Sequence, residues 1–404
     1  MKLTPIGKLA LFLMVLGIGF GAFRAYKSAG GKVSIPGMGG QTTPGTNTNR
    51  TSSPGGNNSG SGSPTVPSTV GENELQIVTS ASKGSWINQQ IDKFNATSDV
   101  KLVPKLVETR EAMQQILAGR LKPALWSPSS VIWADRLSEV LEQKTGSSPL
   151  DTGDVNSYRS VLKSPMVFLT TKANARILRP LLASPQCWSN VEKLSTGKID
   201  FPSSFKWAHA DPLNANSGML TLALIINDYA NRTGQSGSIE TVANSGAFLT
   251  YLKSVESKIV YNSAVQKGSS ALVKSFSDDP SRYSFITAYE SAAVDEVQSN
   301  PDLAVIYPNP TVNSESAVAF LNWPDLSPAQ KAAGQAFLKF ISQPASAQDG
   351  LKDHFRPLRG AGMDSDLTSL SANGFQPNYS AIELPPYAVL NGVAFKWRQE
   401  IARK

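Results

Sequence analysis

Residues 166–170 read MVFLT and form a nearly continuous apolar run. A strand at the surface of a sheet alternates apolar and polar residues, so this run predicts a strand that is buried on both faces. On either side of it, short β-rich runs alternate with helical patterns, beginning at residues 74–79 (ELQIVT). That alternation is typical of an α/β fold with mostly parallel strands.

The same pattern predicts the other elements of residues 74–404. Strands are expected at 124–126, 206–210, 259–261, 283–288, 303–307 and 317–323. Helices are expected around 86–94, 133–141, 219–229 and 387–403. Ser327 and Pro328 are an N-cap and a first helical residue, so they mark the start of another helix.

The net charge of +7 lies mostly in the N-terminal part of the chain. Residues 1–32 carry Lys2, Lys8, Arg24, Lys27 and Lys32 and no acid. The folded part is therefore almost neutral. A nucleic-acid-binding protein needs a clustered positive surface, so we expect no nucleic-acid partner.

The apolar run of residues 9–23 (LALFLMVLGIGFGAF) lies between basic residues. It fits an uncleaved membrane anchor, which we favour and place at residues 1–28, or a cleaved signal peptide. Residues 29–73 are rich in Gly, Ser, Pro, Thr and Asn and predict a disordered linker with a mean reach of about 35–40 Å. Together these segments predict an extracytoplasmic protein that is anchored in the inner, or plasma, membrane of a bacterium.

Three predicted strands end in turns rich in serine or asparagine. The turns are 80–85 (SASKGS), 127–130 (SPSS) and 211–218 (DPLNANSG), and each precedes a predicted helix. Such turns present free backbone N–H groups, hydroxyls and the positive end of a helix dipole. Each could be an N-cap alone. Because ligands of open α/β sheets bind at the carboxyl edge, the three together favour a polar ligand site.

The order of these segments resembles that of the type 2 periplasmic solute-binding proteins of ABC transporters. The first strand and its turn (LQIVTSASKGSWINQQIDKFN), the segment SPMVFLT, the asparagine-rich helix start (ADPLNANSGMLTLALI) and the late segment SFITAYESAAVDEV are similar to that family. The resemblance implies a two-lobed fold with mixed sheets. Lobe 1 would hold about 74–165 and 309–404, and lobe 2 about 166–308.

The resemblance also implies which residues contact the ligand between the lobes. They are Ser80, Ser82, Lys83, Ser127, Ser129, Asn214, Asn216, Ser217, Gly218, Tyr289 and Glu290. The ligand would be a small solute, either an oxyanion or a small polar organic molecule. The partner would be an ABC permease. A tethered ligand sensor or envelope-assembly component that uses the same fold without transport is the alternative.

Enzyme functions are less well supported. Residues 80–83 fit the SxxK pattern and residues 144–146 read KTG, as in penicillin-recognising serine enzymes, but no SDN lies between them and KTG follows a predicted helix. His209 and His354 are far apart in sequence, and Cys187 is the single cysteine. We therefore expect no catalytic residue, no metal site and no cofactor.

Overall fold

The computed structural model describes residues 71–358 and 368–402. Contacts divide the chain into Met1–Ser61 and Gly62–Lys404, and every described residue belongs to the second unit. The predicted anchor (1–28) and nearly all of the predicted linker (29–73) lie outside the described residues. None of the helices in the described part of the chain has the length and apolar character that crossing a bilayer requires.

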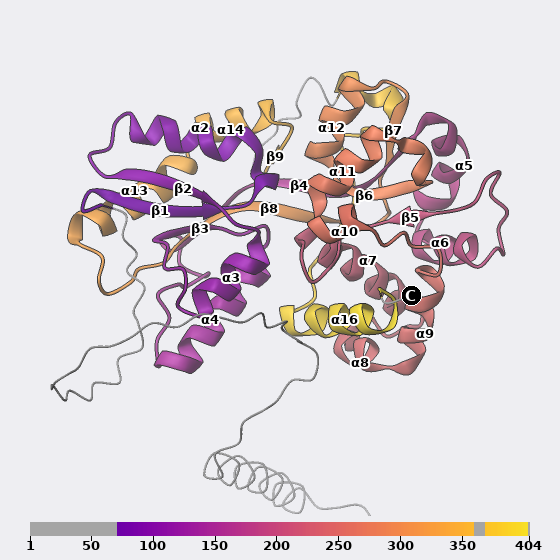
Figure 1. Cartoon of the computed structure of the whole chain (residues 1–404), viewed down its shortest axis with the longest axis horizontal. Coiled ribbons are helices and arrows are strands. Elements are labelled where there is room, and N and C mark those ends of the chain that lie inside the picture. Colours follow the sequence, from indigo (N-terminus) through magenta and orange to yellow (C-terminus); the bar gives the residue numbers. More distant parts are fainter. Residues whose placement is uncertain (1–70, 359–367, 403–404) are drawn as a thin grey trace, which may run out of the picture. The chain divides into compact units, whose positions relative to one another are not determined.

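Lobe 1 is built on a mixed sheet with the strand order β2-β1-β3-β8-β4 (Figure 1). The strands β1, β2 and β3 are parallel, whereas β8 runs antiparallel to β3 and to β4. Their bounds are Glu74–Thr79 (β1), Lys101–Leu106 (β2), Leu125–Ser127 (β3), Tyr158–Thr171 (β4), Thr311–Phe320 (β8) and, pairing with β4, Arg356–Pro357 (β9).

Lobe 2 contains a second group of strands around the other half of β4. Strands β6 and β7 each pair antiparallel with β4, and β5 pairs parallel with β6. Their bounds are Trp207–Ala208 (β5), Phe285–Tyr289 (β6) and Leu303–Ile306 (β7). The short strand β10 (Ala381–Ile382) pairs with the first residues of β8.

The strand β4 is shared between the two lobes. Its first half, up to Pro165, pairs with β8, and its second half, from Met166, pairs with β6 and β7. The apolar run that opened the sequence is this second half, and residues 166–170 are buried. The prediction of a strand buried on both faces is therefore confirmed, although β4 begins earlier, at Tyr158.

Helices cover the sheets of both lobes (Figure 1). Those of lobe 1 are Gly84–Asn95 (α2), Thr109–Leu117 (α3), Val131–Thr145 (α4), Pro328–Ile341 (α13) and Pro344–Lys352 (α14). Those that pack on lobe 2 are Lys172–Leu182 (α5), Cys187–Ser195 (α6), Asn216–Arg232 (α7), Ile239–Asn244 (α8), Gly246–Val255 (α9), Ser263–Lys267 (α10), Ser269–Asp278 (α11), Glu290–Ser299 (α12) and Tyr387–Glu400 (α16). Four short 3-10 turns complete the described elements: Ala81–Lys83 (η1), Ser236–Ser238 (η2), Pro280–Arg282 (η3) and Ser371–Asn373 (η4).

Local sequence and burial explain the start of α13 and the composition of α7. The helix α13 begins with the predicted N-cap: Ser327 and Gln330 form a reciprocal capping box, and Pro328 follows the cap. The helix α7 is apolar on nearly all sides because it is buried between the lobe 2 strands and α6, α8 and α16. Two predicted strands are shorter than expected, since 206–210 yields only β5 and Ile259 forms a single bridge to Trp207.

The C-terminal part of the chain packs on lobe 2, which differs from the sequence-based division. Residues 309–404 were all assigned to lobe 1, but α16 packs against α7 and α8, and Asn373 donates to the carbonyls of Pro301 and Leu303. The helix α16 also contacts α4 of lobe 1. Its buried apolar residues, including Trp397, need an apolar partner, and α7 and α8 provide it, which explains the difference.

A buried ion pair joins the lobes beside β4. Arg356 of β9 donates through Nε to Glu290 Oε1 at 2.7 Å and through a second guanidinium nitrogen to Glu290 Oε2 at 2.5 Å. The hydroxyl of Tyr307 also donates to Glu290. Both charged residues are buried, so each depends on the other for an opposite charge, while Arg356 also donates to the carbonyls of Gln376 and Pro377.

We predict that Arg356→Met lowers the free energy of unfolding by about 3–5 kcal/mol, because it leaves the Glu290 carboxylate buried without its cation. Urea denaturation measures the change. The control is Arg282→Met, which removes the same group from an exposed pair with Asp279 and should change stability little. Equal effects of the two substitutions would contradict the prediction.

Candidate functional site

Three of the predicted ligand residues meet where the lobes face each other. The Asn216 side chain, at the start of α7, donates to the Ser129 carbonyl at 3.3 Å and to the Tyr289 hydroxyl at 3.2 Å. Its Oδ1 accepts from Trp133 Nε1 at 2.7 Å. Ser129 and Trp133 belong to lobe 1, so Asn216 connects a turn of lobe 1 to the first turn of α7 and the end of β6.

Pairs of hydroxyl groups lie in both lobes, close to the contacts that Asn216 makes. In lobe 1 the hydroxyls of Ser80 and Ser82 lie 2.9 Å apart, and in lobe 2 those of Ser217 and Ser269 lie 2.5 Å apart. Burial raises the pKa of Tyr289 to about 12, so its hydroxyl keeps its proton at neutral pH. The junction is therefore rich in hydrogen-bond groups that carry no charge.

Other predicted residues have structural partners instead. Lys83 is buried and donates to the carbonyls of Pro128 and Glu315, at 2.8 and 2.6 Å. Ser127 donates to the Ala317 carbonyl at 2.6 Å, and exposed Asn214 donates to the Gln266 carbonyl at 2.9 Å.

Two further predicted residues, Glu290 and Gly218, stabilise the folded structure. Glu290 is held by Arg356 and Tyr307, as described above. A Cβ atom on Gly218 would lie 2.0 Å from the Ala210 carbonyl oxygen, so glycine is required for the close approach of α7 to the preceding turn.

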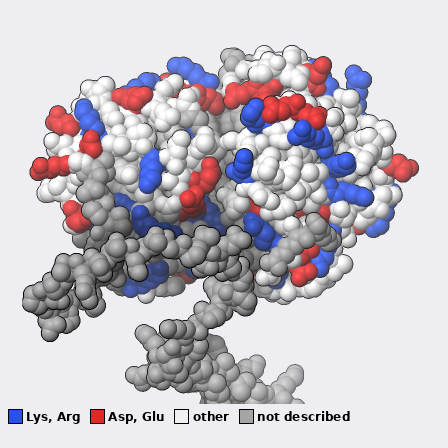
Figure 2. Space-filling model, in the orientation of Figure 1, with Lys and Arg blue, Asp and Glu red and all other residues white. Residues whose placement is uncertain are grey.

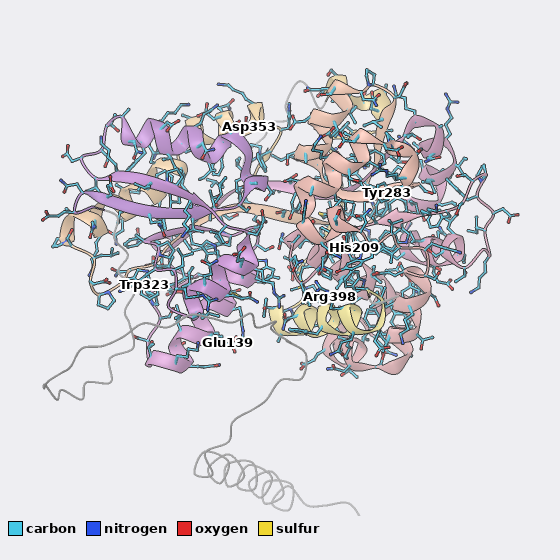
Figure 3. The ribbon with its side chains drawn as sticks, in the orientation of Figure 1. Glu139, His209, Tyr283, Trp323, Asp353 and Arg398 are labelled. Atoms are coloured by element: carbon cyan, nitrogen blue, oxygen red, sulfur yellow. The ribbon has the colours of Figure 1, made fainter. Side chains whose placement is uncertain are left out.

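A cavity of about 300 Å³ lies beside this junction, between the lobes. Its lining comes from both sides of the cleft: Ala81, Ser82, Ser85, Lys352, Asp353, His354 and Phe355 from lobe 1, and Ser270, Ser291, Ala292 and Asp295 from lobe 2. The label of Asp353 in Figure 3 marks the edge of lobe 1 that faces lobe 2. Ser82 and Ser270 connect the cavity to the hydroxyl pairs of the junction.

Three helix N-termini meet at this cavity. Ser85 is in the first turn of α2, Ser270 in that of α11 and Ser291 in that of α12. The first turn of a helix has backbone N–H groups without intrahelical partners and carries a partial positive charge. At α12 the Ser291 N–H already donates to Ser164 Oγ at 3.0 Å. The arrangement can therefore hold an anionic or strongly polar group through the N–H groups of α2 and α11 and through hydroxyls.

The sequence indicated part of this lining. Ser82 was predicted, Ser85 lies in the turn 80–85, and Ser291 follows the predicted residue Glu290. The contributions of Ser270, Asp295 and Asp353 were missed, because each lies within or at the end of a helix and no local pattern marks it as functional. His354 was noted only as isolated, yet its Nε2 lies 3.3 Å from Asp295 Oδ1 across the cleft.

The enzyme motifs do not form a catalytic group. Lys83 Nζ donates to the two carbonyls described above, and the KTG residues 144–146 lie at the end of α4, where Gly146 is the left-handed C-cap. A serine–lysine mechanism needs the amine near the serine hydroxyl. Within residues 71–358 and 368–402, no group of three or more His, Cys, Asp or Glu side chains is placed to hold a metal ion.

Charged side chains of both signs are interspersed over both lobes on the face shown in Figure 2. This agrees with the nearly neutral composition of the folded part. The single cysteine, Cys187, is buried, and burial raises the pKa of its thiol, so the reactive thiolate is disfavoured.

Comparison with known families shows where the chain belongs. Residues 75–355 match the family described as bacterial extracellular solute-binding protein. The chain belongs to this family. It is therefore a solute-binding protein of the extracytoplasmic, ABC-transporter type and not an enzyme, and the predicted family and two-lobed α/β fold with mixed sheets are confirmed.

Solved structures of solute-binding proteins share the fold. The sulfate-binding protein of Mycobacterium tuberculosis is 13% identical, with a TM-score of 0.52, over 81% of this chain and 99% of that one. The ferric binding protein of Campylobacter jejuni is 13% identical, with a TM-score of 0.56, over 80% and 97%. A periplasmic thiamin binding protein is 12% identical, with a TM-score of 0.55, over 81% and 95%. Comparison with curated proteins gives no match.

We predict that Gly218→Ala lowers the free energy of unfolding by roughly 3 kcal/mol, because the new methyl group must displace backbone atoms. The matched control is Gly392→Ala in α16, where a Cβ meets no atom within 4 Å. That substitution should raise stability by roughly 0.5–1 kcal/mol through helix propensity. Chemical denaturation of both variants measures the difference, and a neutral Gly218→Ala would contradict the packing argument.

A second prediction concerns pH. Burial lowers the pKa of Lys83 to about 7, against the opposing effects of Glu315 and Glu108. Between this value and the ordinary lysine pKa, the unfolded chain binds a proton that the folded chain does not, so folding becomes more favourable as pH rises. The stability of the wild type relative to Lys83→Met should therefore grow by about 1.4 kcal/mol per pH unit between pH 7.5 and 9.5.

Urea denaturation at several pH values tests this. The difference between the two proteins isolates Lys83 from other groups that titrate in the same range. A difference that does not change with pH would show that Lys83 stays charged in the folded protein.

Proposed function

We propose that this protein is a membrane-tethered, extracytoplasmic solute-binding protein that captures a small polar or anionic ligand between its lobes and delivers it to an ABC importer. The observation that supports this proposal is that the first turns of α2, α11 and α12 lie at the interlobe cavity. They come from both lobes, so a ligand held by all three is bound only when the lobes are closed.

The polar junction supports capture by closure. In the closed arrangement Asn216 joins Ser129 to Tyr289, and the hydroxyls of Ser80, Ser82 and Ser217 lie close by. These groups are uncharged donors and acceptors, and they can exchange partners at little cost when a polar ligand enters. This arrangement supports the prediction that these side chains contact the ligand.

The tether is part of the proposal. The apolar residues 9–23 and the linker 29–73 would hold the binding domain within about 35–40 Å of the membrane on average, which suits delivery to a permease in the same membrane. A tethered sensor would use the same closure without a permease.

A thermal-shift screen of the full-length chain in mild detergent tests the proposed function. The probes are oxyanions (sulfate, phosphate and molybdate) and polar organic solutes (sugars, polyols and amino acids). A ligand at 100 times its Kd should stabilise the folded state by about 2.7 kcal/mol and raise Tm. Asn216→Ala should weaken binding by about 10-fold, since it removes the contact that joins the lobes.

The matched control is Asn214→Ala, because Asn214 is exposed and two residues away, and it should bind like the wild type. If no small solute raises Tm while a protein partner does, delivery to an importer is ruled out and the sensor function is favoured. If Asn214→Ala weakens binding as much as Asn216→Ala, closure through Asn216 is wrong.

A further inference from the structure

A second concave site lies on lobe 2, outside the cleft between the lobes. It is a groove of about 590 Å³ along α5, and Figure 1 shows α5 at the side of lobe 2 that faces away from lobe 1. Part of its lining is apolar and comes from α5, β7 and η4: Ala175, Pro180, Ala304 and Ala372. The charged residues that line it are all cations: Lys172, Arg176 and Arg179.

The three cations lie on one face of α5, because they are spaced by four and then three residues along the helix. Like charges at these spacings repel each other and lower the stability of a helix. Lys172 is also the first residue of α5, where the positive end of the helix dipole disfavours a cation, and the first turn contains no acid. The arrangement is therefore electrostatically unfavourable by itself, and a bound anion would relieve it.

The described part of the chain supplies no carboxylate that compensates these charges. Elsewhere on lobe 2, for example, Arg232 is paired with Asp228 at 2.9 Å. By contrast, Lys172, Arg176 and Arg179 form no ion pair with any described residue. Charges of one sign in a concave site attract counter-ions more strongly than the same charges on a flat surface. The groove is thus a local positive site on a domain whose composition is almost neutral.

The guanidinium group of Arg179 is held in place by the fold. One of its terminal nitrogens donates to the Val305 carbonyl at 3.4 Å. The same nitrogen lies so close to Gly374 that a Cβ atom on that residue would come within 2.6 Å of it, and Gly374 has a φ of 101°. Glycine at this position therefore makes room for Arg179. The other N–H groups of the guanidinium can bind a ligand, and its planar fork matches two oxygens of a phosphate.

We propose that this groove binds a phosphate-bearing anion with more than one negative charge, such as a diphosphate group. Three cations match an anion of this kind, whereas a single carboxylate would compensate only one of them. The chemistry is the same whether the phosphates belong to a soluble diphosphate or to a lipid headgroup with two phosphates. Because the groove lies outside the cleft, this binding is separate from solute capture. A lipid source would direct the α5 side of lobe 2 toward the bilayer.

Isothermal titration calorimetry of the full-length chain in mild detergent, with inorganic pyrophosphate as the probe, tests the soluble source. We expect binding, and the double variant Arg176→Gln/Arg179→Gln should bind at least about 10-fold more weakly, because two charge-assisted contacts are lost. The matched control is Arg120→Gln. Arg120 is an exposed arginine of lobe 1 that forms no ion pair with a described residue, and its substitution should leave the affinity unchanged.

A second titration tests the lipid source. Micelles of the same detergent that carry cardiolipin, which has two phosphates, are compared with micelles that carry phosphatidylcholine, whose headgroup has no net charge. Tighter binding of cardiolipin that is lost in the double variant supports a lipid headgroup, and pyrophosphate binding that is lost in the same variant supports a soluble anion. If neither probe binds, or if the double variant binds both as tightly as the wild type, the proposal is wrong.

Arg176→Gln alone guards against an effect on folding, because Arg176 is exposed and its side chain has no hydrogen-bond partner among the described residues. This variant should melt like the wild type, as measured by circular dichroism, and should still bind the effective probe several-fold more weakly. An affinity that stays at the wild-type value in this variant would contradict the proposal.

Discussion

The structure depends on β4, a single strand that belongs to both lobes. Its backbone pairs with β8 up to Pro165 and with β6 and β7 from Met166 onward, so each half keeps its strand hydrogen bonds within one lobe and the continuous strand joins the lobes. Relative motion is therefore restricted to bending or twisting near this point. The buried pair of Glu290 and Arg356 lies beside the same crossing and fixes the start of α12 with respect to β9. The shared strand and this ion pair therefore connect the lobes at the same point.

The connection through β4 determines which turns and helix starts can face one another across the cleft. The turns after β1 and β3 lie on lobe 1, whereas the starts of α7, α11 and α12 lie on lobe 2, and only closure brings them together. In the proposed function, the ligand would make contacts with both lobes that neither lobe makes alone. The helix α16 adds to closure, since it is anchored on lobe 2 through Trp397 while Arg110 of lobe 1 donates to its Asn391 at 3.0 Å. The C-terminal helix is thus placed to influence how far the cleft opens.

The site contains two kinds of polar group with different roles. Lys83 and Ser127 donate to backbone carbonyls of lobe 1, and Glu290 accepts from Arg356 of lobe 1, so these three residues hold the structure in place. Ser82, Ser85, Ser270 and Ser291 line the cavity at the ends of helices. The difference cannot be seen from residue type, because a serine at a helix start can cap, support a loop or bind a ligand. It depends on which neighbours the fold supplies.

The sequence by itself determined the α/β class, the buried strand 166–170 and the start of α13, because apolar periodicity and capping are local properties of the chain. It also identified the turns that carry Ser82, Ser129 and Asn216, since parallel strands place their carboxyl ends at one edge. Only the tertiary structure decided that residues 368–402 pack on lobe 2, that Lys83 and Glu290 have structural partners, and that Asp295 and Asp353 face one cavity. Those outcomes depend on contacts between residues far apart in the chain, for which a single sequence contains no local signal.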